Sequence, residues 1–436
     1  MSKLAVFGGT PVRTKSFPSW PVTGEREIEL VSEVVRSGKW WSAQVEANDR
    51  PEVPDPGPGN RVAEIQIRFA RFQNARFGIA CSSGTDSLEI ALRASGVGPG
   101  DEVIVPPYTF ISTASAVLSV NAVPIFADID PNTFNLCPDA AEAAITPRTA
   151  AILPVHFSGH GADMDRFLDL KEKHALRIIE DACHCHGATW KNKGLGSWGD
   201  ASGFSFQASK NLTCGDGGMM LTNDEEINRK AMSIVWYGRL KGTAWYQHHM
   251  LGGNSHLTEF QAAVLLAGFE RLPEQRDLRT RNAHILRRGL AEIPGIKPMP
   301  LDPRATCHSY HLFMMRYCAD ELEGLPRDKF LAALGKEGIP GSKGYAQPLY
   351  KAPVFLECEF YKGGCPLTCS PYGREVDYSS FEERCPETER ACKEAIWIGQ
   401  NSLLGNDDDM ADIVEGYRKV AENTAELRDR EFPEES

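Results

Sequence analysis

Residues 204–218, FSFQASKNLTCGDGG, decide the fold of this 436-residue chain and the chemistry that it offers. An apolar run over 201–206 predicts a buried strand, and Lys210 follows it before a turn with three glycines. A lysine just past a buried strand lies at a site, where burial or nearby cations lower the pKa of its amine so that it can form a Schiff base. Ser205, near the end of the same strand, offers a hydroxyl to a phosphate. For a lysine considered alone, a turn on the surface remains the simpler interpretation.

Short apolar runs alternate with helical segments around this stretch. This alternation is typical of an α/β fold, in which helices cover both faces of a mainly parallel sheet. Ligands of such sheets bind beyond the carboxyl ends of the strands, so the residues that follow each strand are the candidates for a site. Strands are predicted at 77–81, 102–105, 123–127, 149–155, 176–180 and 218–222, and helices at 83–94, 112–120 and 164–174.

Two of these strands are followed by residues with useful chemistry. After 77–81 comes SSGTDS (82–87), which presents free N–H groups at a helix start to an anion such as phosphate, although an ordinary helix cap uses the same residue types. After 176–180 comes Asp181, which is placed to hold a proton on a heterocyclic nitrogen. The segment CHCH (183–186) also suggests a metal site. However, its two cysteines are two positions apart and so are its two histidines, whereas structural zinc is usually bound by two ligand pairs that are separated in the sequence.

An anion-binding helix start, a strand-terminal aspartate and a strand-terminal lysine therefore occur in that order on one predicted sheet. Pyridoxal 5'-phosphate requires this set of groups. The helix start holds its phosphate, the carboxylate pairs with its ring nitrogen, and the lysine binds its aldehyde. The combination predicts this cofactor, which no single motif does.

The sequence resembles the DegT/StrS-type sugar aminotransferases, which are fold type I pyridoxal-phosphate enzymes, over nearly its whole length. The resemblance implies a mainly parallel sheet flanked by helices and a smaller C-terminal α+β domain. It leans toward the branch similar to amino-cyclitol and aminohydroxybenzoate enzymes, and the nucleotide-sugar branch stays open. The motifs that carry it include SSGTDSLEIAL (82–92), IEDACHCHGA (179–188), FSFQASKNLTCGDGG (204–218) and GGNSHLTEFQAAVL (252–265).

The resemblance also implies roles for single residues. Lys210 would form the Schiff base and move the proton, Asp181 would pair with the ring nitrogen, and His184 would bond the ring hydroxyl. The phosphate would be held by Gly84, Thr85 and Ser205. The ring would stack against Phe110, and Asn254 would reach the phosphate from a partner subunit. The last of these implies a homodimer with shared active sites.

Two positions depart from the family pattern, because His256 stands where arginine is frequent and Asp216 where glutamate is usual. The first departure leaves open how a substrate anion is bound. The implied reaction moves an amino group from glutamate or glutamine to a keto-sugar or cyclitol ketone. A dehydratase or lyase of the aminohydroxybenzoate synthase type stays open, and so does a non-catalytic regulator that binds the cofactor. Lys210 argues against a dehydrating relative in which histidine replaces the lysine.

Composition limits the partners and the compartment. The 47 basic and 59 acidic residues give a net charge of −12, which argues against nucleic acid or an anionic membrane as the main partner. No apolar run is long enough for a signal peptide or a membrane span, so we expect a cytoplasmic protein. Four prolines in 294–303 predict a domain boundary between a large cofactor-binding domain over 26–293, preceded by an arm over 1–25, and a small domain over 294–436.

The segment after the predicted sheet is predicted to form helices at 225–235 and 258–272, and 277–293 is expected to extend the helical region. The small domain is predicted to form strands at 311–317 and 395–398. The chain has 12 cysteines, which we expect to stay reduced in the cytoplasm rather than to form a disulfide framework. Cys365, Cys369 and Cys385 leave a metal site in the C-terminal part as a further alternative.

Overall fold

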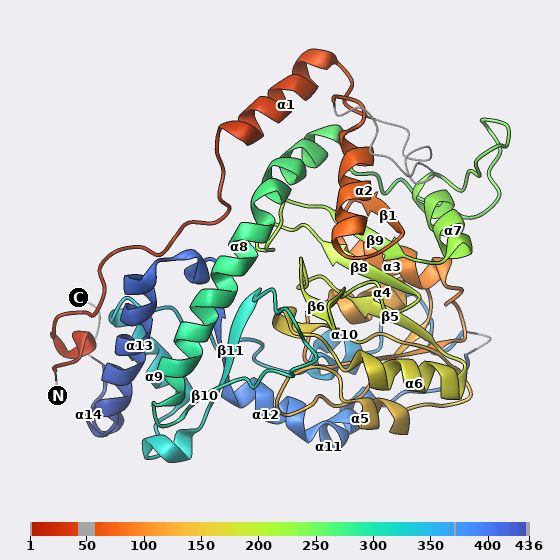
Figure 1. Ribbon diagram of the computed structural model, residues 1–436. Coiled ribbons are helices and arrows are strands. Elements are labelled where there is room, and N and C mark those ends of the chain that lie inside the picture. Colours follow the sequence, from red (N-terminus) through yellow and green to blue (C-terminus); the bar gives the residue numbers. More distant parts are fainter. Residues whose placement is uncertain (1, 42–56, 370–371, 433–436) are drawn as a thin grey trace.

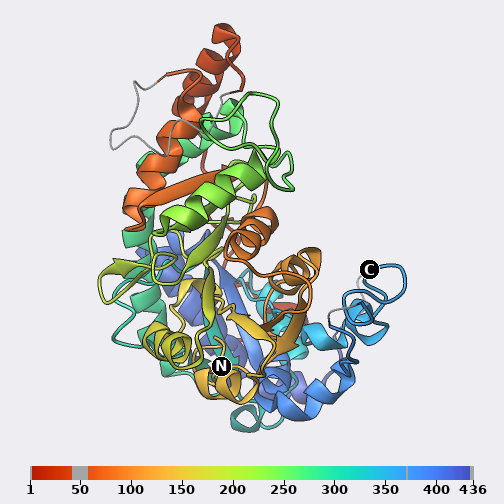
Figure 2. The same cartoon turned by 90° about the vertical axis from the view of Figure 1, so that its right-hand side faces the viewer.

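The computed structural model describes residues 2–41, 57–369 and 372–432 (Figure 1). A seven-stranded sheet forms its centre, and a three-stranded sheet is built from the C-terminal part of the chain. Helix α8 (Glu259–Ala291) runs along both parts. Helix α1 (Glu25–Ser37) stands out at one end, against α8, as both views show (Figure 2).

The central sheet has the strand order β1-β9-β8-β5-β4-β2-β3. Its strands are β1 (Phe77–Cys81), β2 (Glu102–Val105), β3 (Val123–Phe126), β4 (Thr149–Ile152), β5 (Arg177–Asp181), β8 (Ala201–Ser205) and β9 (Gly218–Thr222). The strands run in one direction except β9, which is antiparallel to its neighbours β1 and β8. The predicted α/β fold with a mainly parallel sheet is confirmed. The glycine turn after Lys210 returns the chain beside β8 without a crossover helix, which makes β9 antiparallel.

Helices cover both faces of this sheet. They are α2 (Arg61–Phe72), α3 (Gly84–Ala94), α4 (Ser112–Ser119), α5 (Pro138–Ala143), α6 (Met164–His174) and α7 (Glu225–Val235), together with α8. Successive strand residues point to opposite faces. Ile104 of β2 therefore joins a core with α2, α6 and α8, while Val103 and Val105 join a core with α3, α4 and α7.

Helix α8 joins the predicted helix at 258–272 to the helical extension expected at 277–293. The structure has one helix of 33 residues, capped by Thr258 and continuous through Pro273. An interior proline costs a helix about 3 kcal/mol. Packing outweighs this cost, since α8 contacts α1 and α2 beside the large sheet and α13 (Asp407–Glu422) beside the small one.

The small sheet is antiparallel, with the strand order β10-β11-β12. Its strands are β10 (Ile296–Pro298), β11 (Leu312–Tyr317) and β12 (Ala395–Gly399), and the main helices of this part are α9 (Arg327–Lys336), α12 (Pro386–Glu394), α13 and α14 (Thr424–Asp429). Strand β10 lies inside 294–303, where only a linker was expected. Pairing with β11 and full burial of Ile296 explain why this proline-rich segment adopts strand structure.

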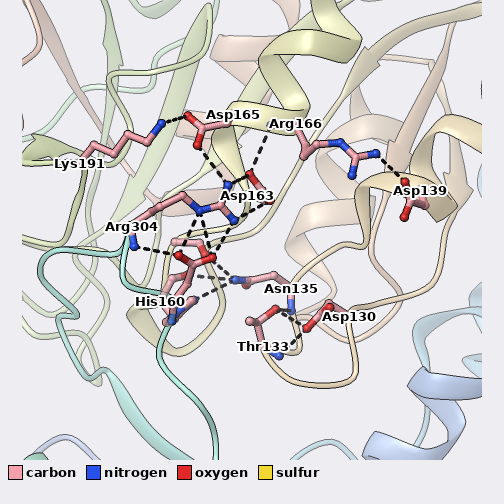
Figure 3. Close-up of polar contacts among 12 residues, drawn as sticks. Asp130, Thr133, Asn135, Asp139, His160, Asp163, Asp165, Arg166, Lys191 and Arg304 are labelled. Atoms are coloured by element: carbon pink, nitrogen blue, oxygen red, sulfur yellow. Dashed lines mark hydrogen bonds and ion pairs between the residues drawn. The ribbon is translucent and has the colours of Figure 1, made fainter.

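The segment after β10 is tied to the large sheet by an ion-pair network (Figure 3). Arg304 lies 2.8 Å from Asp163, 3.1 Å from Asp165 and 2.7 Å from Asp302. Asp163 is also the N-cap of α6, so the network fixes this segment to the start of that helix. Lys191 extends it through a contact of 2.8 Å with Asp165.

Another correction concerns the cysteines near the C-terminus. Cys365 and Cys369 are joined by a disulfide across a Cα–Cα distance of 5.2 Å, in a turn that brings residues four apart together. Cys385 is buried in the apolar core around Phe126. The expectation of reduced cysteines is therefore wrong for this pair, whereas the other ten cysteines are free. Cys385 belongs to no group of three possible metal ligands among the described residues.

The remaining short elements are the hairpin β6 (Thr189–Trp190) and β7 (Lys193–Gly194), and the helices α10 (Pro353–Leu356) and α11 (Phe381–Arg384). None of the helices in the described residues is both long and apolar enough to cross a membrane.

Candidate active site

A cavity of about 640 Å³ opens where the segments after β1, β2, β5 and β8 meet the small sheet and the N-terminal arm. It brings together seven of the eight predicted site residues: Gly84, Thr85, Phe110, Asp181, His184, Ser205 and Lys210. The eighth, Asn254, does not line it. The lining residues that come from the N-terminal arm and from the C-terminal part of the chain, which we term the opposite wall, include Trp20, His311, Tyr345, Trp397, Gln400 and Asn401.

The predicted anion site lies where α3 begins. Ser83 caps this helix by accepting a hydrogen bond from the Asp86 N–H at 3.1 Å. The N–H groups of Gly84 and Thr85 make no hydrogen bond with a described residue, so they can bind a ligand. A Cβ atom on Gly84 would lie 2.6 Å from the Cβ atom of Ser205, so only glycine allows the helix start to approach the end of β8 so closely. Free N–H groups and a serine hydroxyl thus converge in a cradle for phosphate.

Asp181 ends β5 and is 5% exposed. One oxygen of its carboxylate accepts a hydrogen bond from the Thr113 hydroxyl at 2.8 Å, and the other accepts one from the Cys183 N–H at 3.2 Å. These two donors fix the direction of the carboxylate. No cation of the described residues forms an ion pair with it, so it is available to a protonated nitrogen of a ligand.

Lys210 follows β8 and faces the cavity. Desolvation by the surrounding side chains lowers the pKa of its amine, and the partial opposing effects of Cys183 and Asp181 do not cancel it. The Nζ atom makes no hydrogen bond with any residue that the structure describes. A lysine with a lowered pKa holds more of its amine in the unprotonated, nucleophilic form at neutral pH.

A pair of neutral imidazoles lies beside this lysine. Asn211 donates from Nδ2 to the Ser309 carbonyl at 2.8 Å, which turns its Oδ1 toward His311 Nδ1 at 3.2 Å. His311 therefore carries its proton on Nδ1 and leaves Nε2 as an acceptor. Its ring centroid lies 4.2 Å from that of His184. Burial, followed by the nearby charge of Lys210, lowers the pKa of both rings well below 6.5.

The CHCH segment does not form a metal site. His186 is buried, and its Nε2 lies 2.8 Å from the Ser205 carbonyl, whereas Cys185 contacts the His156 carbonyl. His184 alone of the two histidines faces the cavity. Among residues 2–41, 57–369 and 372–432, no three His, Cys, Asp or Glu side chains are grouped as metal ligands.

Two predicted residues lie at the rim of the cavity or outside it. Phe110 is 58% exposed and lines the opening, so one face of its ring is available for stacking. Asn254 is exposed and forms an isolated β-bridge with Trp236, outside the cavity. Within one chain, Asn254 is therefore not part of the site.

The residues of the opposite wall were not predicted from the sequence. Gln400 and Asn401 follow shortly after the predicted strand at 395–398, and His311 opens the one predicted at 311–317. Polar residues at strand ends were the signal that found Asp181 and Lys210 on the large sheet. The same signal on the small sheet would have found these three.

The sequence profile of the DegT/DnrJ/EryC1/StrS aminotransferase family matches residues 56–388, which include the whole phosphate cradle, Asp181 and Lys210. The chain belongs to this family.

Similar proteins and solved structures also support the assignment of this chain to the family. A protein of Streptoalloteichus tenebrarius, assigned as an L-glutamine:3-amino-2,3-dideoxy-scyllo-inosose aminotransferase, is 39% identical over 98% of this chain and 100% of its own length. The L-glutamine:2-deoxy-scyllo-inosose aminotransferase of the same organism is 36% identical over 98% of this chain and 99% of its own length. The crystal structure of 3-amino-5-hydroxybenzoic acid synthase superposes with a TM-score of 0.82 at 30% identity, covering 94% of this chain and 100% of that one.

The family cofactor, pyridoxal 5'-phosphate, fits the cavity. A related structure from Bacillus subtilis, with a TM-score of 0.76 and 27% identity over 94% of this chain and 86% of that one, holds the pyridoxamine form of this cofactor. In this chain, the N–H groups at the start of α3 lack partners among the described residues, as does the buried Nδ1 of His184. A phosphate would accept hydrogen bonds from these N–H groups, and a ring with polar substituents would provide a partner for His184 Nδ1. The chain is thus an aminotransferase that uses pyridoxal 5'-phosphate.

Proposed function

We propose that this aminotransferase moves the amino group of glutamine to the ketone of an inositol-like cyclitol. The choice of a cyclitol ketone as the acceptor rests on one observation about the residues that line the cavity. Lys210 is the only lysine or arginine among its described lining residues, and the opposite wall offers neutral hydrogen-bonding groups from His311, Gln400 and Asn401. Such a lining suits an uncharged ring with several hydroxyls better than the diphosphate of a nucleotide sugar. The assigned activities of the relatives support glutamine as donor and an inosose as acceptor.

The proposal assigns a task to each residue of the cofactor side. When bound, pyridoxal phosphate supplies the electron sink for loss of a proton from the amino-bearing carbon. Lys210 would hold the cofactor aldehyde and move the proton, and Asp181 would keep a proton on the ring nitrogen. His184 would bond the ring hydroxyl and Phe110 would stack on the ring, while Gly84, Thr85 and Ser205 would hold the phosphate around the start of α3. The domain boundaries are a separate matter. The division of the chain into an N-terminal arm (1–25), a large cofactor-binding domain (26–293) and a small C-terminal domain (294–436) stays a prediction.

The proposal also includes a homodimer in which Asn254 of one subunit reaches the phosphate in the other. Exposed aromatic side chains around this residue support it. Trp41 is 52% exposed, and its ring lies 5.9 Å from that of His256, which in turn lies 5.2 Å from Tyr237. Clustered exposed aromatic residues mark interaction surfaces. Mixing Lys210→Ala with Asn254→Ala subunits should restore activity above either parent, and absence of any recovery would count against shared sites.

A screen of the two half-reactions tests the chemistry. The pyridoxal form of the purified enzyme should lose its absorbance at the visible edge on addition of glutamine. The resulting enzyme form should regain that absorbance with scyllo-inosose or its 2-deoxy form, and not with a nucleotide-linked keto-sugar. Recovery only with the nucleotide sugar would overturn the proposed acceptor. Loss of water from a cyclic keto acid that already carries an amino group, giving an aromatic amino acid without any amino donor, would instead favour the dehydratase alternative.

A further inference from the structure

Arg279, on α8, is a fully buried cation without a counter-ion. Its exposed fraction is 0%, and none of the described carboxylates forms an ion pair with it. Its Nη1 has no hydrogen-bond partner among the described residues, and burial alone lowers its pKa to about 9. The ring of Trp20, from the N-terminal arm, lies 5.4 Å from the guanidinium carbon and screens it from water. An unpaired buried charge is destabilising, so its presence next to the cavity requires an explanation.

The guanidinium is bound to one side chain of the cavity wall, that of Gln400. Arg279 donates from Nε to Gln400 Oε1 at 3.0 Å, and Nη2 donates to the same oxygen. A guanidinium can only donate, so this contact places the amide oxygen toward Arg279 and turns Nε2 away from it. Gln400 lines the cavity, and its Nε2 makes no hydrogen bond with a described residue. The cavity wall therefore presents an N–H donor that is polarised by the charge behind it.

No other described lining group offers a positive charge to a substrate. Lys210, the single lining cation, is required by the cofactor. His256 stands where the family often has arginine, and desolvation lowers its pKa, so this position is neutral at pH 7. An amino acid that enters the cavity brings a carboxylate that needs a donor, and the arginine-backed amide is the group with the matching charge.

We propose that Gln400 Nε2, backed by Arg279, binds the α-carboxylate of the amino donor. This inference rests on the proposed aminotransferase function. Gln400 is the residue in contact with the donor, and Arg279 is a positioning residue that orients and polarises the amide. The bound carboxylate acts as the counter-ion that Arg279 lacks. A carboxylate gains more from this charge than the neutral oxygens of a ketone do, so the pair distinguishes the two substrates that share one cavity.

The test compares three variants of the holoenzyme: Gln400→Leu, Gln400→Glu and the matched control Gln275→Leu. Gln275 lies one turn before Arg279 on α8 and does not line the cavity. The first readout is the dissociation constant of 2-methylglutamine, which has the carboxylate but no α-hydrogen and so cannot lose the proton that amino transfer requires. Gln400→Leu should weaken it by about 10- to 100-fold, the range for a hydrogen bond to a charged group. Gln400→Glu should weaken it more, because its carboxylate neutralises Arg279 and repels the ligand, while the control should match the wild type.

The second readout separates the carboxylate from the rest of the donor. Replacing the α-carboxylate of 2-methylglutamine by its amide should weaken binding to the wild type about tenfold or more. The same replacement should weaken binding to Gln400→Leu by less than about twofold, because this enzyme has already lost the carboxylate contact. Equal losses in both enzymes, or an unchanged dissociation constant in Gln400→Leu, would overturn the proposal. A wild-type enzyme that binds 2-methylglutamine but fails to aminate any cyclitol ketone would refute the proposed acceptor and leave the carboxylate site standing.

Discussion

The two walls of the cavity differ in origin and in charge. The wall from the large sheet carries Lys210, Asp181 and the phosphate cradle of α3, and each of these groups lies at or just after the carboxyl end of a strand that runs in the common direction. The opposite wall carries His311, Gln400 and the ring of Trp20, which come from the small sheet and from the N-terminal arm. The first wall holds groups suited to one fixed cofactor. The second presents neutral groups whose donor and acceptor directions are set by residues behind them.

This difference shows how one cavity can keep the same cofactor chemistry in both half-reactions while it binds a different substrate in each. Asp181 is oriented by donors from the large-sheet part of the chain, Thr113 on α4 and Cys183 just after β5. Gln400 is oriented by Arg279 on α8, and His311 by Asn211. Changes in the first wall should therefore impair both half-reactions equally, whereas changes in the second should impair one half-reaction more than the other.

The largest effect is expected for Lys210→Ala. It removes the only group of the first wall that can hold the aldehyde and move a proton, so turnover should fall by at least about 1000-fold in both half-reactions. The absorbance of the bound cofactor at the visible edge should be lost as well. An unchanged spectrum would contradict the assignment of this lysine. Lys193→Ala, a lysine of the hairpin β6–β7 outside the cavity, is the matched control and should behave as the wild type.

Asp181→Asn should lower the rate of both half-reactions by about 100-fold, within the range of effects of acid–base groups. The amide cannot stabilise a proton on the ring nitrogen, although it keeps the size and can still accept a hydrogen bond from Thr113. Stopped-flow absorbance measures the two halves separately. A loss confined to one half would show that Asp181 binds a substrate rather than the cofactor.

A smaller effect is expected for Gly84→Ala. The added Cβ would lie 2.6 Å from Ser205 Cβ, which forces the helix start and β8 apart at the phosphate cradle. Overpacking of this kind costs about 1–3 kcal/mol, so cofactor affinity should fall by about 10- to 100-fold. Gly335→Ala on α9 has open space around its Cβ and should leave affinity unchanged. Equilibrium dialysis of the cofactor distinguishes the two.

The smallest effect concerns pH. The pKa values of His184 and His311 are lowered by burial, so each ring becomes protonated only when the pH falls well below 6.5. Neither ring then changes charge between about pH 6 and pH 8. The affinity for the uncharged ketone should vary by less than about twofold over this range. A titration midpoint within it that disappears in His311→Gln would show that the ring is charged in the working enzyme.

The sequence predicted the first wall well, and the physical reason is local. A parallel strand ends at the edge of its sheet, so the residue that follows it in the sequence lies at the site, as do Asp181 and Lys210. The phosphate cradle is a helix start, which also depends on neighbours in the sequence. The sequence did not predict three features, namely the antiparallel direction of β9, strand β10 in a proline-rich segment and the pairing of Cys365 with Cys369. Each of these depends on contacts that local sequence patterns do not record.

By itself, the sequence determined the α/β fold, the family and the cofactor, and it predicted the position of the lysine that we propose reacts. These follow from contiguous motifs in which each residue acts with its immediate neighbours. Only the tertiary structure decided that Arg279 is buried without a counter-ion, that Gln400 is turned by it, and that Trp20 covers the guanidinium. These residues are far apart in the sequence and meet only because α8 passes from the large sheet to the small one. That packing sets the direction of the Gln400 N–H donor in the cavity, so no pattern within a single segment of the sequence can predict it.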